Sequence, residues 1–168
     1  MTFLFQIIAH TPLWVWSVLV FVLGLGLLGL RPRIVPPWRL GILPLVGIGT
    51  SLSGLVQSPQ PALAFAAWFF ALFVGLPLGH AAGRRRPARL LEDGRLAVAG
   101  GWFMLLFGVS IFVARYVLGV LFGVAPALKA EPVWIGLAAG VGGVIAGIGI
   151  GWLAGLLLQA RRSPVVVG

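Results

Sequence analysis

The chain alternates between long apolar stretches and short polar segments, and this pattern predicts transmembrane helices. A helix needs about 20 apolar residues to cross the hydrocarbon core of a bilayer. Stretches close to or above this length occur over residues 12–30, 40–56, 62–82, 97–124 and 133–159. We therefore predict an all-α membrane protein, in which a bundle of five transmembrane helices forms a single transmembrane domain over residues 1–168.

The basic residues orient these spans. Ten arginines gather in three patches: Arg31, Arg33 and Arg39; Arg84, Arg85, Arg86, Arg89 and Arg95; and Arg161 and Arg162. When the spans are counted alternately, all three patches fall on one side of the membrane, and Lys129 alone is on the other. Because basic residues are retained in cytoplasmic loops, the N-terminus is predicted outside and the C-terminus inside.

Composition narrows the class of protein further. Hydrophobic residues make up 60% of the chain, charged residues make up 9%, and the mean hydropathy is +1.10, which lies far outside the range of soluble domains. A net charge of +9 could suggest nucleic acid. Here, however, the charges flank apolar spans, where they meet anionic headgroups. We therefore expect membrane lipids as partners and no nucleic acid.

Several classes of membrane enzyme are disfavoured because the residues they need are missing. Proton-coupled pumps carry acids within their spans, whereas Glu92, Asp93 and Glu131 all lie in predicted loops. Zinc and two-metal sites need several histidines or acids on facing helices, but His10 and His80 lie at opposite membrane faces. The chain has no cysteine, which excludes thiolate chemistry. We expect a protein that is not an enzyme and has no catalytic residue, metal or cofactor.

A ladder of glycines in the last span predicts close helix packing. Gly143, Gly147, Gly151 and Gly155 recur every four residues, which places them on one helix face. Small residues at this spacing let helix backbones approach closely in lipid. Packing within the chain is favoured over the alternative, a homodimer seam. The expected protein partners are a homo-oligomer or a larger membrane complex. The glycines of the third span, Gly75, Gly79 and Gly83, are a candidate partner.

The largest polar segment is the loop over residues 83–96. It contains five arginines and the turn signal Asp93-Gly94. The segment is compatible with a small hairpin that caps the cytoplasmic face, and a solvated topogenic loop is favoured over a catalytic one.

Arg115 is the one charged residue predicted deep within a span. It lies nine residues before Val124, which corresponds to about 13 Å along a helix. Facing lipid at that depth would cost about 2.5 kcal/mol or more. Arg115 also shares a helix face with the small residues Gly101, Gly108 and Gly119, so we expect that face to be packed.

Polar stripes on two other spans lie at matching depth and complete a candidate ligand site in the outer leaflet. The predicted site comprises Arg115, Tyr116, His10, Ser17, Thr50, Ser53 and Gln57. Two interpretations stay open for Arg115. It either donates to carbonyls and hydroxyls of neighbouring helices as a structural lock, or it binds a lipid headgroup, a quinone or a small anion.

Short motifs along the chain carry a resemblance to a protein family. They are the run His10-Thr11-Pro12-Leu13-Trp14-Val15-Trp16, then Arg31-Pro32-Arg33, Leu43-Pro44 with Ser51-Leu52-Ser53-Gly54, and Arg115-Tyr116 followed by Gly119. In this order they resemble an uncharacterised family of small five-span bacterial membrane proteins, classed as a domain of unknown function. The resemblance implies a bacterial inner-membrane location and carries no known activity.

The sequence therefore predicts a multi-pass protein of the bacterial inner (plasma) membrane. Its expected role is a non-enzymatic ligand- or lipid-binding module or an accessory subunit of a membrane assembly. The alternative is a small-solute or anion transporter or channel that uses the outer-leaflet site around Arg115. A hydrophilic path from that site to the cytoplasm would distinguish the two.

Overall fold

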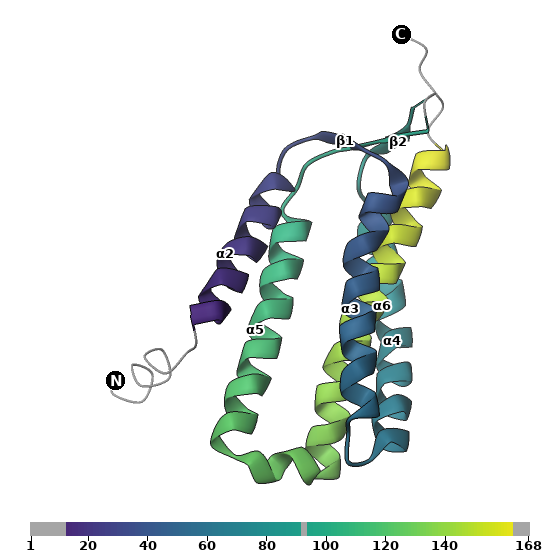
Figure 1. The fold of residues 1–168 in the computed structure, drawn as a ribbon. Helices are drawn as coiled ribbons and strands as arrows, with labels where there is room; N and C mark the ends of the chain where they lie inside the picture. The colour runs from purple at the N-terminus through teal and green to yellow at the C-terminus, as the bar shows by residue number, and fades with distance from the viewer. Residues whose placement is uncertain (1–12, 92–93, 163–168) are drawn as a thin grey trace. The chain divides into compact units, whose positions relative to one another are not determined.

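The computed structural model describes residues 13–91 and 94–162, which are mostly helical (Figure 1). The elements in chain order are α2 (Leu13–Leu28), β1 (Arg33–Val35), α3 (Pro37–Val56), α4 (Pro61–Arg84), β2 (Ala88–Leu90), β3 (Leu96–Val98), α5 (Phe103–Val124), the 3-10 helix η1 (Pro126–Ala130) and α6 (Pro132–Arg162). Of these helices, α4, α5 and α6 are long and apolar enough to cross a membrane. Contacts divide the chain into two compact units. One contains α2 and α5, and the other contains α3, α4, α6 and the three strands.

Proline marks the start of three helices. α3, α4 and α6 begin at Pro37, Pro61 and Pro132. At the first helical position the missing N–H of proline loses no hydrogen bond, and its fixed φ suits the helix. These helices also extend slightly beyond the predicted spans. α3 begins before the predicted start at Leu40, and α6 runs to Arg162 rather than to Gln159.

The predicted start of the fourth span, at residue 97, is wrong. Residues 96–98 form β3, and α5 begins only at Phe103. The backbone between β3 and α5 lies close to the segment that follows α2. A Cβ added at Gly100 would lie 2.7 Å from the carbonyl carbon of Arg31, and the Gly101 N–H donates to the Gly29 carbonyl at 3.0 Å. Gly100 allows this approach, because a side chain there would overlap the backbone of Leu30 and Arg31.

The three short strands form a sheet that the all-α prediction did not include. Its order is β1-β3-β2, and both pairings are antiparallel. β2 and β3 form a small hairpin in the region of the loop over residues 83–96, as the sequence allowed. Gly94, the second residue of the turn signal, has a φ of 75°, a left-handed conformation that glycine adopts without steric cost. β1 adds to this hairpin from a segment about 60 residues earlier in the chain.

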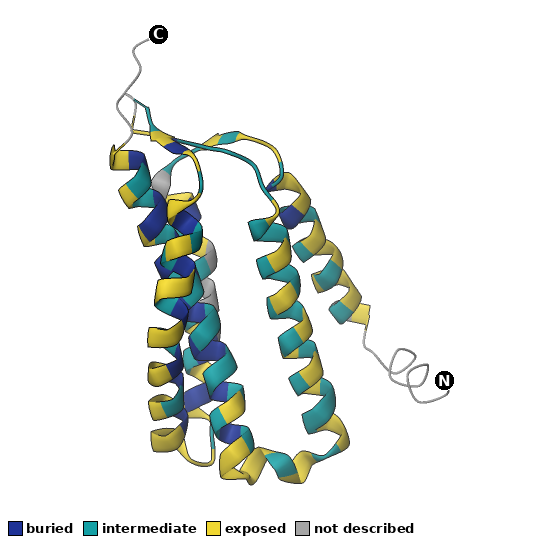
Figure 2. Ribbon diagram, turned by 180° about the vertical axis from the view of Figure 1, so that it is seen from behind, coloured by how far each residue is buried: buried dark blue, intermediate teal, exposed yellow. Residues whose placement is uncertain are grey.

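α4 and α6 pack backbone to backbone along the predicted glycine ladder. A Cβ at any of the seven glycines of this contact would overlap the backbone of the other helix: Gly75, Gly79 and Gly83 of α4, and Gly143, Gly147, Gly151 and Gly155 of α6. The four α6 glycines lie against the carbonyl oxygens of Trp68, Leu72, Leu76 and His80, in that order. Residue numbers increase in the same direction along both helices, so α4 and α6 run parallel. Figure 2 shows the resulting row of buried residues on α6.

α3 runs antiparallel to α6 on another face of that helix. Its Ser51 lies near Gly142, and its Pro44 lies near Gly149. The core of this unit contains Leu55, Ala64, Trp68, Ile135, Ala139 and Ala146, all of them buried. Small residues on α6 therefore allow close approach on two sides of the helix.

The second unit is the antiparallel pair α2 and α5. Gly26 lies against Leu105, and a Cβ at Gly108 would lie 3.1 Å from Val22 Cγ1. α5 has no buried residue among those the structure describes.

Candidate functional site

Nine arginines gather at one end of the unit formed by α3, α4 and α6: Arg33, Arg39, Arg84, Arg85, Arg86, Arg89, Arg95, Arg161 and Arg162. The helix directions explain this. The parallel helices α4 and α6 both end there, and the antiparallel helix α3 begins there. β2 contacts α6, which brings the sheet to the same end (Figure 1). Patches that are far apart in sequence thus form one basic surface, which we call the arginine face.

The opposite end of this unit carries little net charge. The connection between α3 and α4, residues 57–60, contains only polar uncharged residues and proline. The described charges near the start of α6 are Lys129 and Glu131, which offset each other. Net positive charge is therefore concentrated at one end of the unit, and the other end is nearly neutral.

An aromatic residue lies at the arginine face, at the start of α3. Trp38 is 64% exposed, and the Arg39 guanidinium lies 5.6 Å from the centre of its ring. Tryptophan is enriched where the apolar core of a bilayer meets the headgroups. This pair is typical of a helix end at that depth.

The sheet has an inner and an outer face, as the alternation along its strands requires. On the inner face, Ala88 and Leu96 are almost fully buried, at 1% and 0% exposed. On the outer face, Ile34, Ala97 and Arg89 are in register across the three strands, and Ile34 is 54% exposed. The outer face thus has a small apolar centre and one arginine.

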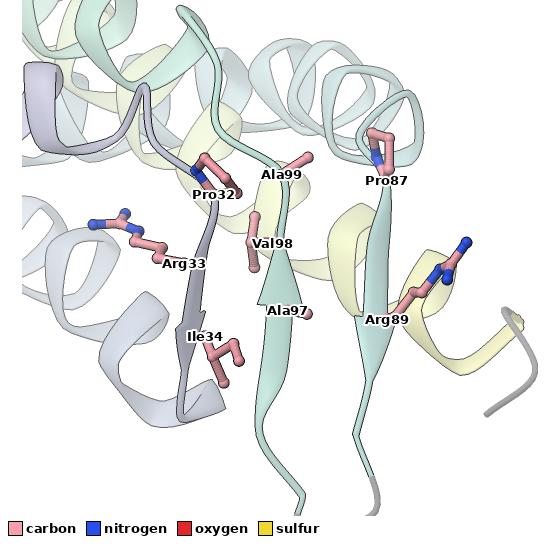
Figure 3. A pocket seen from close by; sticks show the side chains of 8 residues that line it. All are labelled: Pro32, Arg33, Ile34, Pro87, Arg89, Ala97, Val98 and Ala99. Atoms are coloured by element: carbon pink, nitrogen blue, oxygen red, sulfur yellow. The ribbon is translucent and has the colours of Figure 1, made fainter. Parts of the chain in front are cut away.

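An open groove with a volume of about 670 Å³ lies along this sheet (Figure 3). Its lining comes from all three strands and the residues that precede or follow them: Pro32, Arg33, Ile34, Pro87, Arg89, Ala97, Val98 and Ala99. This volume is in the range of small-molecule sites, about 300–1,000 Å³. A backbone hydrogen bond of 3.1 Å from the Ala99 N–H to the Pro87 carbonyl holds one end of it.

The two arginines of the groove lie on its flanks. Arg33 belongs to β1 and Arg89 belongs to β2, the two edge strands of the sheet. Figure 3 shows their side chains extending in opposite directions, away from the central strand β3. Arg33 pairs with Val98 in the row of the inner face and Arg89 pairs with Ala97 on the outer face, so the two guanidiniums extend from opposite faces of the sheet.

The predicted ligand residues are divided between the two units. Arg115, Tyr116 and Ser17 lie in the unit formed by α2 and α5. Arg115 is exposed there, and Tyr116 stacks on Phe112 with ring centres 6.0 Å apart. The Ser17 hydroxyl donates to the Leu13 carbonyl at 3.3 Å, so it is satisfied within its own helix.

The face of α5 that carries Arg115 is packed only in part within this unit. Gly108 contacts α2, whereas Gly119 is exposed and has no neighbour within 4 Å of an added Cβ.

The other predicted ligand residues lie on α3 or outside the described chain. Ser53 is exposed, Gln57 is exposed at the C-cap, and Thr50 lies within the helix. His10 lies outside the described residues.

Ser51 is a buried polar residue that the predicted stripe missed. It is 5% exposed, and its hydroxyl oxygen would lie 3.0 Å from a Cβ added at Gly142. The signal was present in the sequence, because Pro44, Ile48, Ser51 and Leu55 recur at helical spacing on one side of α3.

Comparisons with known proteins identify an uncharacterised relative. An uncharacterised protein of Pasteurella multocida (strain Pm70) is 36% identical over 73 residues, which cover 44% of this chain and 54% of that protein. The chain thus spans about half the length of this curated relative. No family profile and no solved structure match the chain.

The chemistry available to the arginine face is recognition of anions. Arginine presents a planar fork of donors that matches phosphate and carboxylate. Over residues 13–91 and 94–162, no group of three or more histidine or acidic side chains is placed to hold a metal ion.

Proposed function

We propose that this protein is a non-enzymatic, anionic-lipid-binding module of the bacterial inner membrane, and that it acts as an accessory subunit of a membrane assembly. The observation that carries the proposal is the gathering of nine arginines at one end of three apolar helices. Each basic residue near a membrane surface contributes about 1 kcal/mol of attraction to anionic lipid. A surface with this many arginines is strong enough to select such lipids from a mixed bilayer.

The proposed topology has five spans, with the N-terminus outside and the arginine face in the cytoplasm. The parallel course of α4 and α6 supports it, because the chain between them must cross back and α5 is long enough to do so. The orientation is supported by the arginines at one end of the α3–α4–α6 unit, because basic residues favour the cytoplasmic side of a membrane. The similarity to a protein of Pasteurella multocida and the resemblance noted above support a bacterial membrane.

The proposal is tested by thermal unfolding in a neutral detergent with added lipid. We expect phosphatidylglycerol to raise the melting temperature, phosphatidylcholine to leave it unchanged, and 500 mM salt to reduce the difference, because ions screen exposed charges. An equal rise with both lipids, independent of salt, would contradict anionic-lipid binding.

A further inference from the structure

We propose that the start of α3 and the outward side of that helix bind one anionic phospholipid, with its phosphate at Arg39 and an acyl chain along the helix. This inference rests on the proposed function and assigns it a defined site. Binding to the arginine face in general would need only net charge. The start of α3 adds an aromatic ring beside the cation and an apolar path for the chain.

Trp38 and Arg39 converge although they are neighbours in sequence. Consecutive residues of a helix do not normally face each other. The Arg39 guanidinium nevertheless lies 5.6 Å from the centre of the Trp38 ring, within the range of a cation–π contact. Both residues are exposed. The contact therefore brings the charge of Arg39 to the side of the helix that Trp38 occupies.

The charge of Arg39 calls for an anion from outside the described chain. Over residues 13–91 and 94–162 the one acidic residue is Glu131, which lies at the opposite end of the α3–α4–α6 unit. No carboxylate of these residues therefore neutralises Arg39. A phosphate can do so, because its oxygens match the planar donors of a guanidinium. Trp38 is of the residue type that is enriched at headgroup depth, where phospholipids present that phosphate.

The side of α3 that carries Trp38 is apolar and lies opposite its packed side. Leu40 and Ser51 belong to the packed side and are 5% exposed each. At 3.6 residues per turn, Trp38, Ile42 and Leu45 project about 140–200° away from Leu40. They are 64%, 45% and 74% exposed. This outward side begins at the cation and continues into the depth of the membrane.

The length of the outward side fits one acyl chain. Gly49 follows Trp38 by eleven residues, which corresponds to about 16 Å along a helix. Half of the hydrocarbon core is about 15 Å thick, so this path reaches the middle of the bilayer. Gly49 is exposed, and a Cβ added there would have no neighbour within 4 Å. An acyl chain can therefore approach the helix backbone at that depth.

The two features select the ligand in different ways. In a bilayer any phospholipid can cover the apolar side of α3, so the choice among lipids depends on the headgroup at Arg39. A net negative headgroup meets the cation without bringing a second one. A soluble phosphate meets Arg39 as well, but it leaves Ile42 and Leu45 uncovered.

Native mass spectrometry of the intact chain in detergent tests the site. The probes are phosphatidylglycerol, phosphatidylcholine and glycerol 3-phosphate, which carries a phosphate without acyl chains. The site variants are Arg39→Gln and Trp38→Leu, and both positions are exposed, so neither change removes a buried side chain. The matched control is Arg161→Gln, which removes one charge from an exposed position of the arginine face on another helix.

We expect one phosphatidylglycerol per wild-type chain, bound more tightly than phosphatidylcholine and not displaced by glycerol 3-phosphate at the same concentration. Arg39→Gln should lose about tenfold in phosphatidylglycerol affinity, because a charge-assisted contact is removed, and Arg161→Gln about twofold or less. Trp38→Leu should lose about two- to fivefold, through the missing cation–π contact. Should Arg39→Gln fail to fold, Arg39→Lys serves in its place. It keeps the charge without the planar fork, and we expect it to bind more weakly than wild type.

The contradicting outcomes differ in what they overturn. Equal losses in Arg39→Gln and Arg161→Gln would mean unspecific attraction, which ends this inference and leaves the proposed function standing. Full affinity in Trp38→Leu would overturn the paired site. Displacement by glycerol 3-phosphate would make the ligand a soluble anion, and a wild-type dimer without lipid would make a second copy the occupant of α3. Equal binding of phosphatidylcholine would overturn the proposed function as well.

Discussion

Gly75 of α4 and Gly147 of α6 face each other so closely that neither has room for a side chain. A Cβ added at Gly75 would lie 3.1 Å from the Cα of Gly147, and one added at Gly147 would lie 3.0 Å from the Cα of Gly75. Both also lie against backbone atoms of the opposite helix, which cannot move aside as a flexible side chain would. This pair sets the separation of the two helices.

Gly147→Ala should therefore destabilise the protein by about 1–3 kcal/mol, the usual effect of overpacking. Gly54→Ala in α3 is the matched control, because Gly54 is exposed and has no neighbour within 4 Å of an added Cβ. There the same substitution should be neutral or stabilise by up to about 1 kcal/mol, through helix propensity. Thermal unfolding in detergent measures both. A Gly147→Ala protein as stable as Gly54→Ala would show that the two helices do not meet in this way.

The stability of the sheet should depend mainly on the side chains of its inner face, above all on Leu96. Leu96→Ala removes a fully buried side chain and should cost about 2–5 kcal/mol. Ile34→Ala, on the outer face and half exposed, should stay within about 0.5 kcal/mol of wild type. Hydrogen exchange of residues 88–98 reports on the strands directly. Equal protection of these amides in both variants would contradict the assigned faces.

Much of this arrangement could be predicted from the sequence, and the failures have identifiable causes. Long apolar stretches and four-residue glycine spacing depend on local periodicity, which one chain displays in full. The sheet depends instead on pairing β1 with a strand about 60 residues away, and strands of three residues carry almost no periodicity. For that reason the sequence predicts a helix from residue 97, where the structure has β3, and does not predict the groove along the sheet.

Substitution of Arg115 tests whether this residue binds a ligand in the outer leaflet or stabilises the helices. If it binds a ligand, Arg115→Leu should leave the protein folded and remove a copurifying anionic lipid or cofactor, since leucine avoids the cost of holding a cation within the depth of the membrane. If Arg115 is a structural lock, the same variant should lose about 1–3 kcal/mol and keep its ligand profile. Arg115→Lys refines the comparison, because it keeps the charge but not the fork of donors. Melting curves and lipid analysis of the three proteins distinguish the two roles.

Topology can be mapped readily because the chain has no cysteine. Arg85→Cys and Gln60→Cys both introduce a thiol at an exposed position, at opposite ends of α4. With a membrane-impermeant maleimide, Arg85→Cys should react only from the cytoplasmic side and Gln60→Cys only from outside. The reverse pattern would invert the orientation, and labelling of both from one side would contradict a transmembrane α4.

The most direct test of the arginine face as a lipid-binding surface uses native nanodiscs, in which an amphipathic polymer extracts the protein with its surrounding lipid and without detergent. The lipid content of these discs is then measured. The ratio of anionic to neutral lipid is measured in the discs and in the bulk membrane of the same cells. We predict that wild-type discs are enriched in anionic lipid, and that replacing Arg33, Arg89, Arg161 and Arg162 by glutamine reduces the enrichment. Wild-type discs with the same ratio as the bulk membrane would contradict the proposal.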